Sequence, residues 1–208
     1  MENDEIICVG NEIYSKELAG IKSLTFDNNF CLIIEKLLNC KGKVILSGIG
    51  KSGYIAQKIS STFSSTGTSS FYIHSTEANH GDLGNIQNND IVIIISKSGN
   101  TTEIKPLVSY CNTYNIELIG LTENKNSFLE KNSSLSYIIP KHNEACYLNL
   151  APSTSTTTSL ILGDILALTL SKLKNFTKDD FKKNHPGGSL GLYLTKFKNN
   201  LNSNLSIA

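Results

Sequence analysis

Short apolar runs, each bounded by polar or glycine-containing turns, recur along this chain. Isoleucine, valine and leucine dominate them, and the run at 91–95 contains only isoleucine and valine. A β-branched run without polar alternation is typical of a strand buried on both faces, as in a parallel sheet. The pattern predicts five strands, at 43–47, 70–74, 91–95, 116–121 and 135–139.

Between these runs, apolar residues recur every three or four positions, which is the spacing of one helix face. This spacing predicts one or two helices within 11–40 and further helices after residue 53, at about 101–114, at about 126–131 and at 159–173. Strands that alternate with helices predict an α/β fold, a three-layer αβα sandwich with a mostly parallel five-stranded sheet. We expect a single domain over residues 1–208, with the helices of 11–40 packed on it.

Charge and composition exclude several classes of protein. The 208 residues include 19 Lys and Arg against 18 Asp and Glu, so no strong field favours nucleic acid or an anionic membrane as a partner. The acidic start lacks the layout of a signal peptide, and no apolar run reaches the roughly 18 residues of a membrane span. The five cysteines are odd in number and have no CxxC spacing. We therefore expect reduced thiols and a cytoplasmic location.

The residues after the strand at 91–95 are small, hydroxylated and glycine-bearing. They run Ser-Lys-Ser-Gly-Asn-Thr-Thr-Glu at 96–103, where a helical pattern begins. A strand-turn-helix unit directs backbone N–H groups and the positive helix end at one spot, to which Ser96, Ser98 and Thr101 add hydroxyls. Alone, such a stretch is more often an ordinary turn with a good N-cap. Polar loops also follow the first, second and fifth strands, and these loops meet at one edge of a parallel sheet.

The glycines at 48, 50 and 53 have the spacing of a dinucleotide fingerprint. That fingerprint expects an acidic residue at the end of the second strand, where this chain has His74, so the match fails. A P-loop fails too, because its first glycine would fall at Ile45, inside a strand. Two glycine/serine loops on neighbouring strands suit a small phosphorylated ligand instead. Lys51, at a helix start, would then lie near the phosphate or the sugar.

Several loop residues can transfer protons. His80 lies in the loop at 75–89, and His185 precedes a rigid Pro-Gly-Gly turn. Glu103 lies in the first turn behind the hydroxyl loop, where helix-dipole charge alone would explain it. Glu144 lies in the loop leaving the fifth strand. Two carboxylates and a histidine near a phosphate site are suited to moving a proton next to a carbonyl.

Taken together, these motifs resemble the sugar isomerase (SIS) domain, and specifically the D-arabinose 5-phosphate isomerases. The resemblance covers about residues 11–195 and is carried by seven segments, at 48–53, 65–68, 77–84, 96–103, 144–146, 150–157 and 185–191. The segments His-Gly-Asp-Leu-Gly, Glu-Ala-Cys and His-Pro-Gly-Gly, in this order, are the specific ones. Many members carry a pair of CBS domains after the SIS domain, and we expect this chain to lack them and their regulation.

The resemblance implies interconversion of D-ribulose 5-phosphate and D-arabinose 5-phosphate through a cis-enediol(ate), which supplies Kdo for lipopolysaccharide or capsule. It places the catalytic set on Lys51, Glu103, Glu144 and His185. It places substrate contacts on Ser52, Gly67, Thr68, His80, Ser96, Ser98 and Thr101. It implies no required cofactor, leaves room for a zinc ion at His74, and implies a homotetramer whose sites combine residues of neighbouring subunits.

Within that mechanism, either Glu103 or Glu144 removes the proton between C1 and C2, and a buried carboxylate with a raised pKa suits this role. His185 or His80 moves a proton between the oxygens, and Lys51 stabilises negative charge. Two alternatives stay open. One is another SIS isomerase acting on a heptose or hexulose phosphate. The other is a sugar-phosphate sensor, although only about 40 residues precede the first strand and they have no basic face.

Overall fold

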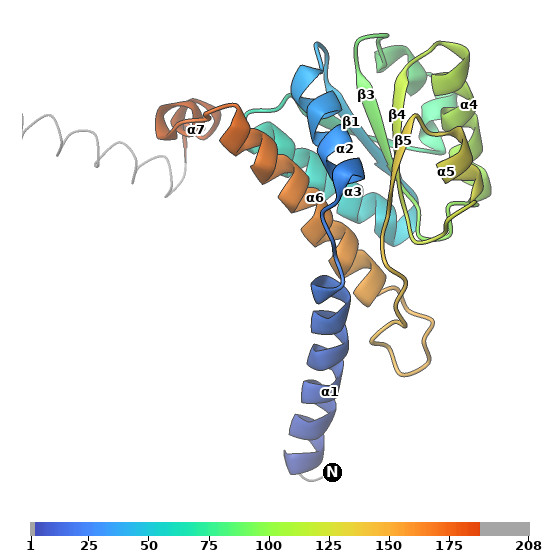
Figure 1. Ribbon diagram of the computed structural model, residues 1–208, viewed down its shortest axis with the longest axis vertical. Coiled ribbons are helices and arrows are strands. Elements are labelled where there is room, and N and C mark those ends of the chain that lie inside the picture. Colours follow the sequence, from blue (N-terminus) through green and yellow to red (C-terminus); the bar gives the residue numbers. More distant parts are fainter. Residues whose placement is uncertain (1–2, 188–208) are drawn as a thin grey trace, which may run out of the picture.

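The computed structural model describes residues 3–187, which contain one five-stranded sheet (Figure 1). The strand order is β2-β1-β3-β4-β5 and every neighbouring pair is parallel. The strands are β1 Val44–Gly48, β2 Ser70–His74, β3 Ile91–Ile95, β4 Glu117–Thr122 and β5 Leu135–Ile138. The predicted five-stranded parallel sheet is confirmed, with every strand within one residue of its expected bounds.

Helices cover both faces of the sheet. Along β3, Ile93 and Ile95 pack into one core cluster, and Val92 and Ile94 into the other. The first cluster is covered by α2 Asn28–Asn39, α3 Gly50–Ser65 and α6 Thr154–Leu173, and the second by α4 Lys105–Thr113 and α5 Phe128–Asn132. Because successive strand side chains point to opposite faces, a strand made only of isoleucine and valine needs both layers. The three-layer αβα sandwich is confirmed.

The N-terminal region forms two helices and begins earlier than predicted. The first, α1 Asn3–Lys22, extends away from the sandwich and contacts α6 (Figure 1). The helices meet closely at Gly20, where a Cβ atom would lie 2.4 Å from Thr154 Cγ2. Most of α1 is exposed, and its exposed residues include the large apolar side chains Ile6, Ile7, Val9, Ile13 and Tyr14.

The helix α6 begins five residues before the predicted start and crosses the molecule from one edge of the sheet to the other. Its first turn lies beside the loop that leaves β5. Lys174, the residue after its last turn, donates a hydrogen bond to Thr68, which lies just before β2. At 20 residues it spans about 30 Å. A further helix, α7 Lys178–Asn184, was not predicted; its polar sequence lacks a helical apolar stripe, but Thr177 and Asp180 form a capping box.

Residues 3–187 also contain three short 3-10 turns: Glu77–His80, Asp82–Asn85 and Thr102–Ile104. The last of these opens the helix predicted from about residue 101, which continues as α4. No helix within residues 3–187 has the length and apolarity needed to cross a membrane.

Candidate active site

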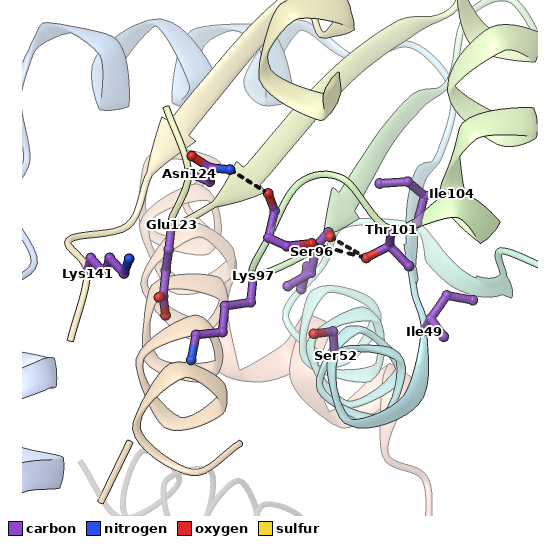
Figure 2. Close-up of a pocket in the computed structure, with 11 residues that line it drawn as sticks. Ile49, Ser52, Ser96, Lys97, Thr101, Ile104, Glu123, Asn124 and Lys141 are labelled. Atoms are coloured by element: carbon purple, nitrogen blue, oxygen red, sulfur yellow. Dashed lines mark hydrogen bonds between the residues drawn. The ribbon is translucent and has the colours of Figure 1, made fainter. Parts of the chain in front are cut away.

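A cavity of about 480 Å³ opens at the carboxyl ends of β1 and β3 (Figure 2). The strand order reverses direction between these two strands, because β2 lies on one side of β1 and β3 on the other. In open parallel sheets, ligands bind at this crevice. The polar lining consists of Ser52, Ser96, Lys97, Ser98, Thr101, Glu123, Asn124 and Lys141. The fold therefore places the hydroxyl loop at 96–101 where a ligand site is expected.

The hydroxyl loop is a tight turn held by its own side chains. Ser96 Oγ accepts from the Gly99 amide at 3.1 Å and lies 3.0 Å from Thr101 Oγ1, and Ser98 Oγ accepts from the Asn100 amide at 3.2 Å. Gly99 has a φ of +64°, which a residue with a side chain rarely adopts. A Cβ atom there would also lie 2.2 Å from Ser127 Oγ. The turn therefore depends on glycine at this position.

The end of β4 fixes the hydroxyl loop from the side. Thr122 Oγ1 donates to the Lys97 carbonyl at 3.1 Å, and Asn124 Nδ2 donates to the Ser98 carbonyl at 3.0 Å. The amide of Leu129 donates to the Gly99 carbonyl at 2.9 Å. The loop is thus preorganised to present hydroxyl groups and amides to an anion.

Lys97 joins the hydroxyl loop to the loop before α6. Its Nζ donates to Glu144 Oε1 at 2.5 Å, although its side chain is 41% exposed and that of Glu144 only 2%. Glu144 also accepts from the Ser155 hydroxyl at 2.5 Å, the Ser155 amide at 3.1 Å and the Ser153 amide at 2.8 Å. A buried carboxylate with this many donors is satisfied as an anion.

These contacts set the protonation of Glu144. Burial acts to raise its pKa, but the hydrogen bonds from Lys97, Ser155 and Ser153 outweigh burial and lower the pKa to about 2. We expected a raised pKa for a carboxylate that acts as base, and for Glu144 this is wrong. Within one chain, Glu144 is an ionised partner of Lys97.

Glu123 has the opposite character. It follows the last residue of β4 and points into the cavity, between Lys97 and Lys141 in the view of Figure 2. Its Oε2 atom is buried and has no hydrogen-bond partner among residues 3–187. Burial raises its pKa to about 7; the negative charge of Glu144 adds to this effect, and Lys97 and Lys141 oppose it. The carboxyl group therefore changes charge near neutral pH.

Four of the predicted substrate contacts lie together in the cavity: Ser52, Ser96, Ser98 and Thr101. Glu144 is joined to them through Lys97. Lys51 and Glu103, in the first turns after β1 and β3, are exposed and do not line the cavity. His80 is exposed in the 3-10 turn at 77–80.

Three other predicted residues lie at the opposite edge of the sheet. Gly67 and Thr68 precede β2; Gly67 packs on Phe176, and Thr68 Oγ1 accepts from Lys174 Nζ at 3.0 Å. His185 follows α7, stacks on Phe181, and its Nδ1 lies 2.9 Å from the Phe181 carbonyl. These residues adjoin the far end of α6, about 30 Å from Glu144 by the length of that helix. The end of the segment at 185–191 lies outside the described residues.

His74 ends β2 and was predicted as a zinc ligand. Its Nδ1 is buried without a hydrogen-bond partner among the described residues, which fits an unused ligand atom. Residues 3–187 contain no group of three or more His, Cys, Asp or Glu side chains arranged to hold a metal ion. The part of one chain that the structure describes therefore supplies fewer than three such ligands, and a metal at His74 would need others from elsewhere.

Four polar residues of the cavity lining were not predicted from the sequence: Lys97, Glu123, Asn124 and Lys141. Lys97 lies within the hydroxyl loop, in which the sequence pattern singled out only the hydroxyl groups. Glu123 and Asn124 directly follow the fourth strand, and no site residue was predicted in the loop after that strand. Their position after a strand of a parallel sheet was the signal that could have identified them.

Comparisons with known proteins identify a family model and relatives that this chain resembles. Residues 37–169 match the family model of the SIS domain. The chain is 43% identical over 184 residues to the arabinose 5-phosphate isomerase KdsD of Salmonella typhi, covering 88% of this chain and 56% of that protein. It is 48% identical over 159 residues to the arabinose 5-phosphate isomerase KpsF of Escherichia coli, covering 76% and 50%. The chain thus spans about half the length of these curated relatives.

Two solved structures are similar over all or nearly all of their length. The structure of c3406 from Escherichia coli CFT073 in complex with arabinose 5-phosphate is 42% identical, with a TM-score of 0.86, covering 89% of this chain and 100% of that one. A protein from Bacteroides fragilis that is described as a candidate phosphosugar isomerase involved in capsule formation is 35% identical, with a TM-score of 0.84, covering 86% of this chain and 97% of that one.

Proposed function

This chain belongs to the SIS-domain family, and we propose that it is an aldose–ketose isomerase that interconverts D-arabinose 5-phosphate and D-ribulose 5-phosphate. The observation that carries the proposal is the preorganised hydroxyl loop at 96–101, which lines a cavity of about 480 Å³ at the crevice of the sheet. A cavity of this size holds a small sugar phosphate. Similarity to a structure solved with arabinose 5-phosphate supports the choice of pentose phosphate.

In the proposed complex, the phosphate group binds the hydroxyls of Ser96, Ser98 and Thr101 and the amides of their loop. Ser52, from the first turn of α3, adds a donor on the other side of the cavity. Anchoring the phosphate fixes C1 and C2 of the open-chain sugar relative to the groups that transfer protons. The proposed groups are Lys51, Glu103, Glu144 and His185.

The reaction exchanges a carbonyl and a hydroxyl between C1 and C2 through an enediol(ate). A base takes the proton on the carbon next to the carbonyl and returns it to the neighbouring carbon. Glu144, with a pKa of about 2, is a weak base in one chain and holds Lys97 in place. This leaves Glu103 as the proposed carbon base, although neither it nor Lys51 lines the cavity within one chain. We assign the stabilisation of negative charge to Lys51 together with Lys97, which does line the cavity.

We also propose that the active form is a homotetramer whose sites are shared between subunits. Within one chain, Glu144 and His185 adjoin opposite ends of α6, so one subunit does not bring the proposed catalytic set together. The exposed apolar residues of α1 give a surface on which a second copy can pack. We place the protein in the cytoplasm, where its free thiols persist, and its product in the synthesis of Kdo.

The test is an assay of purified, EDTA-treated protein with D-arabinose 5-phosphate, in which the formation of ribulose 5-phosphate is measured. Ketose formation without added metal would establish the reaction and show that no metal ion is needed. Ketose formation only after addition of zinc would retain the reaction and make the ion a requirement. Absence of turnover under both conditions would reject the proposed activity.

A further inference from the structure

The cavity has two chemically different ends, which Figure 2 separates. At one end lie uncharged donors, Ser52, Ser96 and Thr101. At the other lie Lys97, Lys141 and Glu123. If the phosphate occupies the hydroxyl end, as in the proposed function on which this inference rests, the rest of the sugar extends toward the charged end. The carbonyl end of a five-carbon sugar phosphate is the part farthest from its phosphate.

The charged end offers one acidic group that is not already engaged. The two oxygens of Glu144 are filled by Lys97, Ser155 and Ser153. Glu123 lines the cavity, and its Oε2 atom is buried without a hydrogen-bond partner among residues 3–187. A buried polar atom without a partner costs free energy, so its retention at a ligand cavity favours a ligand as the partner.

We propose that Glu123 is a further catalytic residue, the group that transfers protons at the two oxygens of the bound sugar phosphate. In the direction from aldose to ketose, the base removes the proton from C2. The carboxylic acid of Glu123 then gives its proton to the carbonyl oxygen on C1, so that an O–H bond forms there as the one on Glu123 breaks. The carboxylate next takes the proton from the hydroxyl on C2 as that C–O bond becomes a carbonyl, and the base returns its proton to C1. The substrate gains and loses the same number of protons, and no oxidant or cofactor is needed.

This transfer needs a group that is protonated in part of the molecules at neutral pH and ionised in the rest. The environment of Glu123 provides that condition. Burial and Glu144 favour its neutral form, whereas Lys97 and Lys141 favour its carboxylate, so the pKa is about 7. A pKa near the working pH is the most effective for acid–base catalysis.

The experiment compares wild type, Glu123→Gln and a control, Glu35→Gln, which removes a carboxylate from an exposed position on α2. For each, kcat and KM for D-arabinose 5-phosphate are measured between pH 5.5 and 9. Glutamine keeps the size and removes the transferable proton. We expect kcat of Glu123→Gln to fall about 100-fold or more with little change in KM, and the control to match wild type. The ionisation near pH 7 should disappear from the variant's profile, while that of the substrate phosphate, near pH 6, stays in all three.

Unchanged kcat in Glu123→Gln, or a change in KM alone, would overturn the inference while leaving the proposed isomerase intact. If wild type itself shows no turnover, the proposed function fails. A binding measurement then tests whether Glu123 contacts the sugar phosphate. Carbon-13 NMR of labelled carboxyl groups, with the Glu123 signal identified by its loss in the glutamine variant, is followed against pH with and without D-arabinose 5-phosphate. A shift of the titration midpoint on addition of the sugar phosphate would keep Glu123 as a ligand contact that exchanges a proton. An unmoved midpoint would overturn the proposal.

Discussion

Lys97 Nζ lies 2.5 Å from Glu144 Oε1, so a residue of the hydroxyl loop after β3 is fixed by a buried carboxylate from the loop after β5. The pair ties two loops that are far apart in sequence, and it leaves Glu144 ionised. Its role in the site is therefore to orient the loop and to place a positive charge at the cavity wall.

Replacing Lys97 by methionine should destabilise the protein and weaken sugar-phosphate binding. Glu144 would remain buried without its cation, and removal of one partner of a fully buried pair costs roughly 3–5 kcal/mol. Because the Lys97 side chain is 41% exposed, water can solvate the Glu144 carboxylate in part after the lysine is removed. We therefore expect the free energy of unfolding to fall by about 1–2 kcal/mol. Urea unfolding measures the loss. The control, Lys172→Met at an exposed position of α6, should change stability little; an equal loss in both variants would contradict the prediction.

Glu144→Gln should lower stability at neutral pH as well as turnover. An amide group in place of one oxygen would turn its N–H donors toward the donors of Ser153, Ser155 or Lys97, at a cost of about 1–3 kcal/mol. The pKa of Glu144 is lowered in the folded state, so its contribution is present above the unfolded pKa near 4.5 and is lost as pH falls toward 2. Unfolding at pH 7 and pH 3.5 tests this: the deficit of the variant should shrink at the lower pH. A constant deficit would show that the charge is not what stabilises the loop.

Gly99→Ala should disrupt the hydroxyl loop. The alanine would hold a positive φ and its Cβ would collide with Ser127, so we expect a loss of about 2 kcal/mol or more. Gly84→Ala is the matched control, since a Cβ there has no neighbour within 4 Å. Thermal unfolding and binding of inorganic phosphate, measured on both variants, should show a defect only in Gly99→Ala. If Gly84→Ala also bound phosphate weakly, the geometry of the hydroxyl loop would not explain the loss of binding in Gly99→Ala.

The fold and the hydroxyl loop could be predicted from the sequence because both depend on local signals. The apolar run of β3 and the Ser/Gly/Thr turn after it are contiguous, and they specify a buried strand and a tight hydroxyl-bearing turn. The protonation of Glu123 and Glu144 could not be predicted. Both are loop carboxylates in the sequence, and their pKa values, about 7 and about 2, follow from which donors the tertiary structure brings to each. The position of His185 likewise depends on the path that α6 takes across the sheet, which its correctly predicted end at residue 173 does not give.

Glu123→Gln should gain stability over wild type as pH rises. The folded-state pKa of Glu123 is raised to about 7. In the wild type, the contribution of this group to the free energy of unfolding is therefore fully present below the unfolded pKa near 4.5 and is lost as pH rises through 7. The glutamine variant avoids that loss. Because the carboxylate is only partly buried, we expect on the order of 1 kcal/mol, or about 2–4 °C in Tm at pH 8.5 relative to pH 5. Thermal scans of both proteins at the two pH values check this, with Glu35→Gln as control. The same Tm difference at both pH values would place the Glu123 carboxyl in contact with water.

Mixing two inactive variants should restore activity if sites are shared between subunits. Glu144→Gln and His185→Ala each lack one group of the proposed set, and in one chain these residues adjoin opposite ends of α6. In an oligomer that pairs Glu144 of one subunit with His185 of another, random mixing after denaturation and refolding gives about a quarter of the sites an intact pair. Recovery of roughly that fraction of wild-type turnover is the expected result, and each variant refolded alone should stay inactive. Failure of the mixture to recover, with size-exclusion chromatography showing mixed oligomers, would mean that both groups act within one subunit or that one of them does not act.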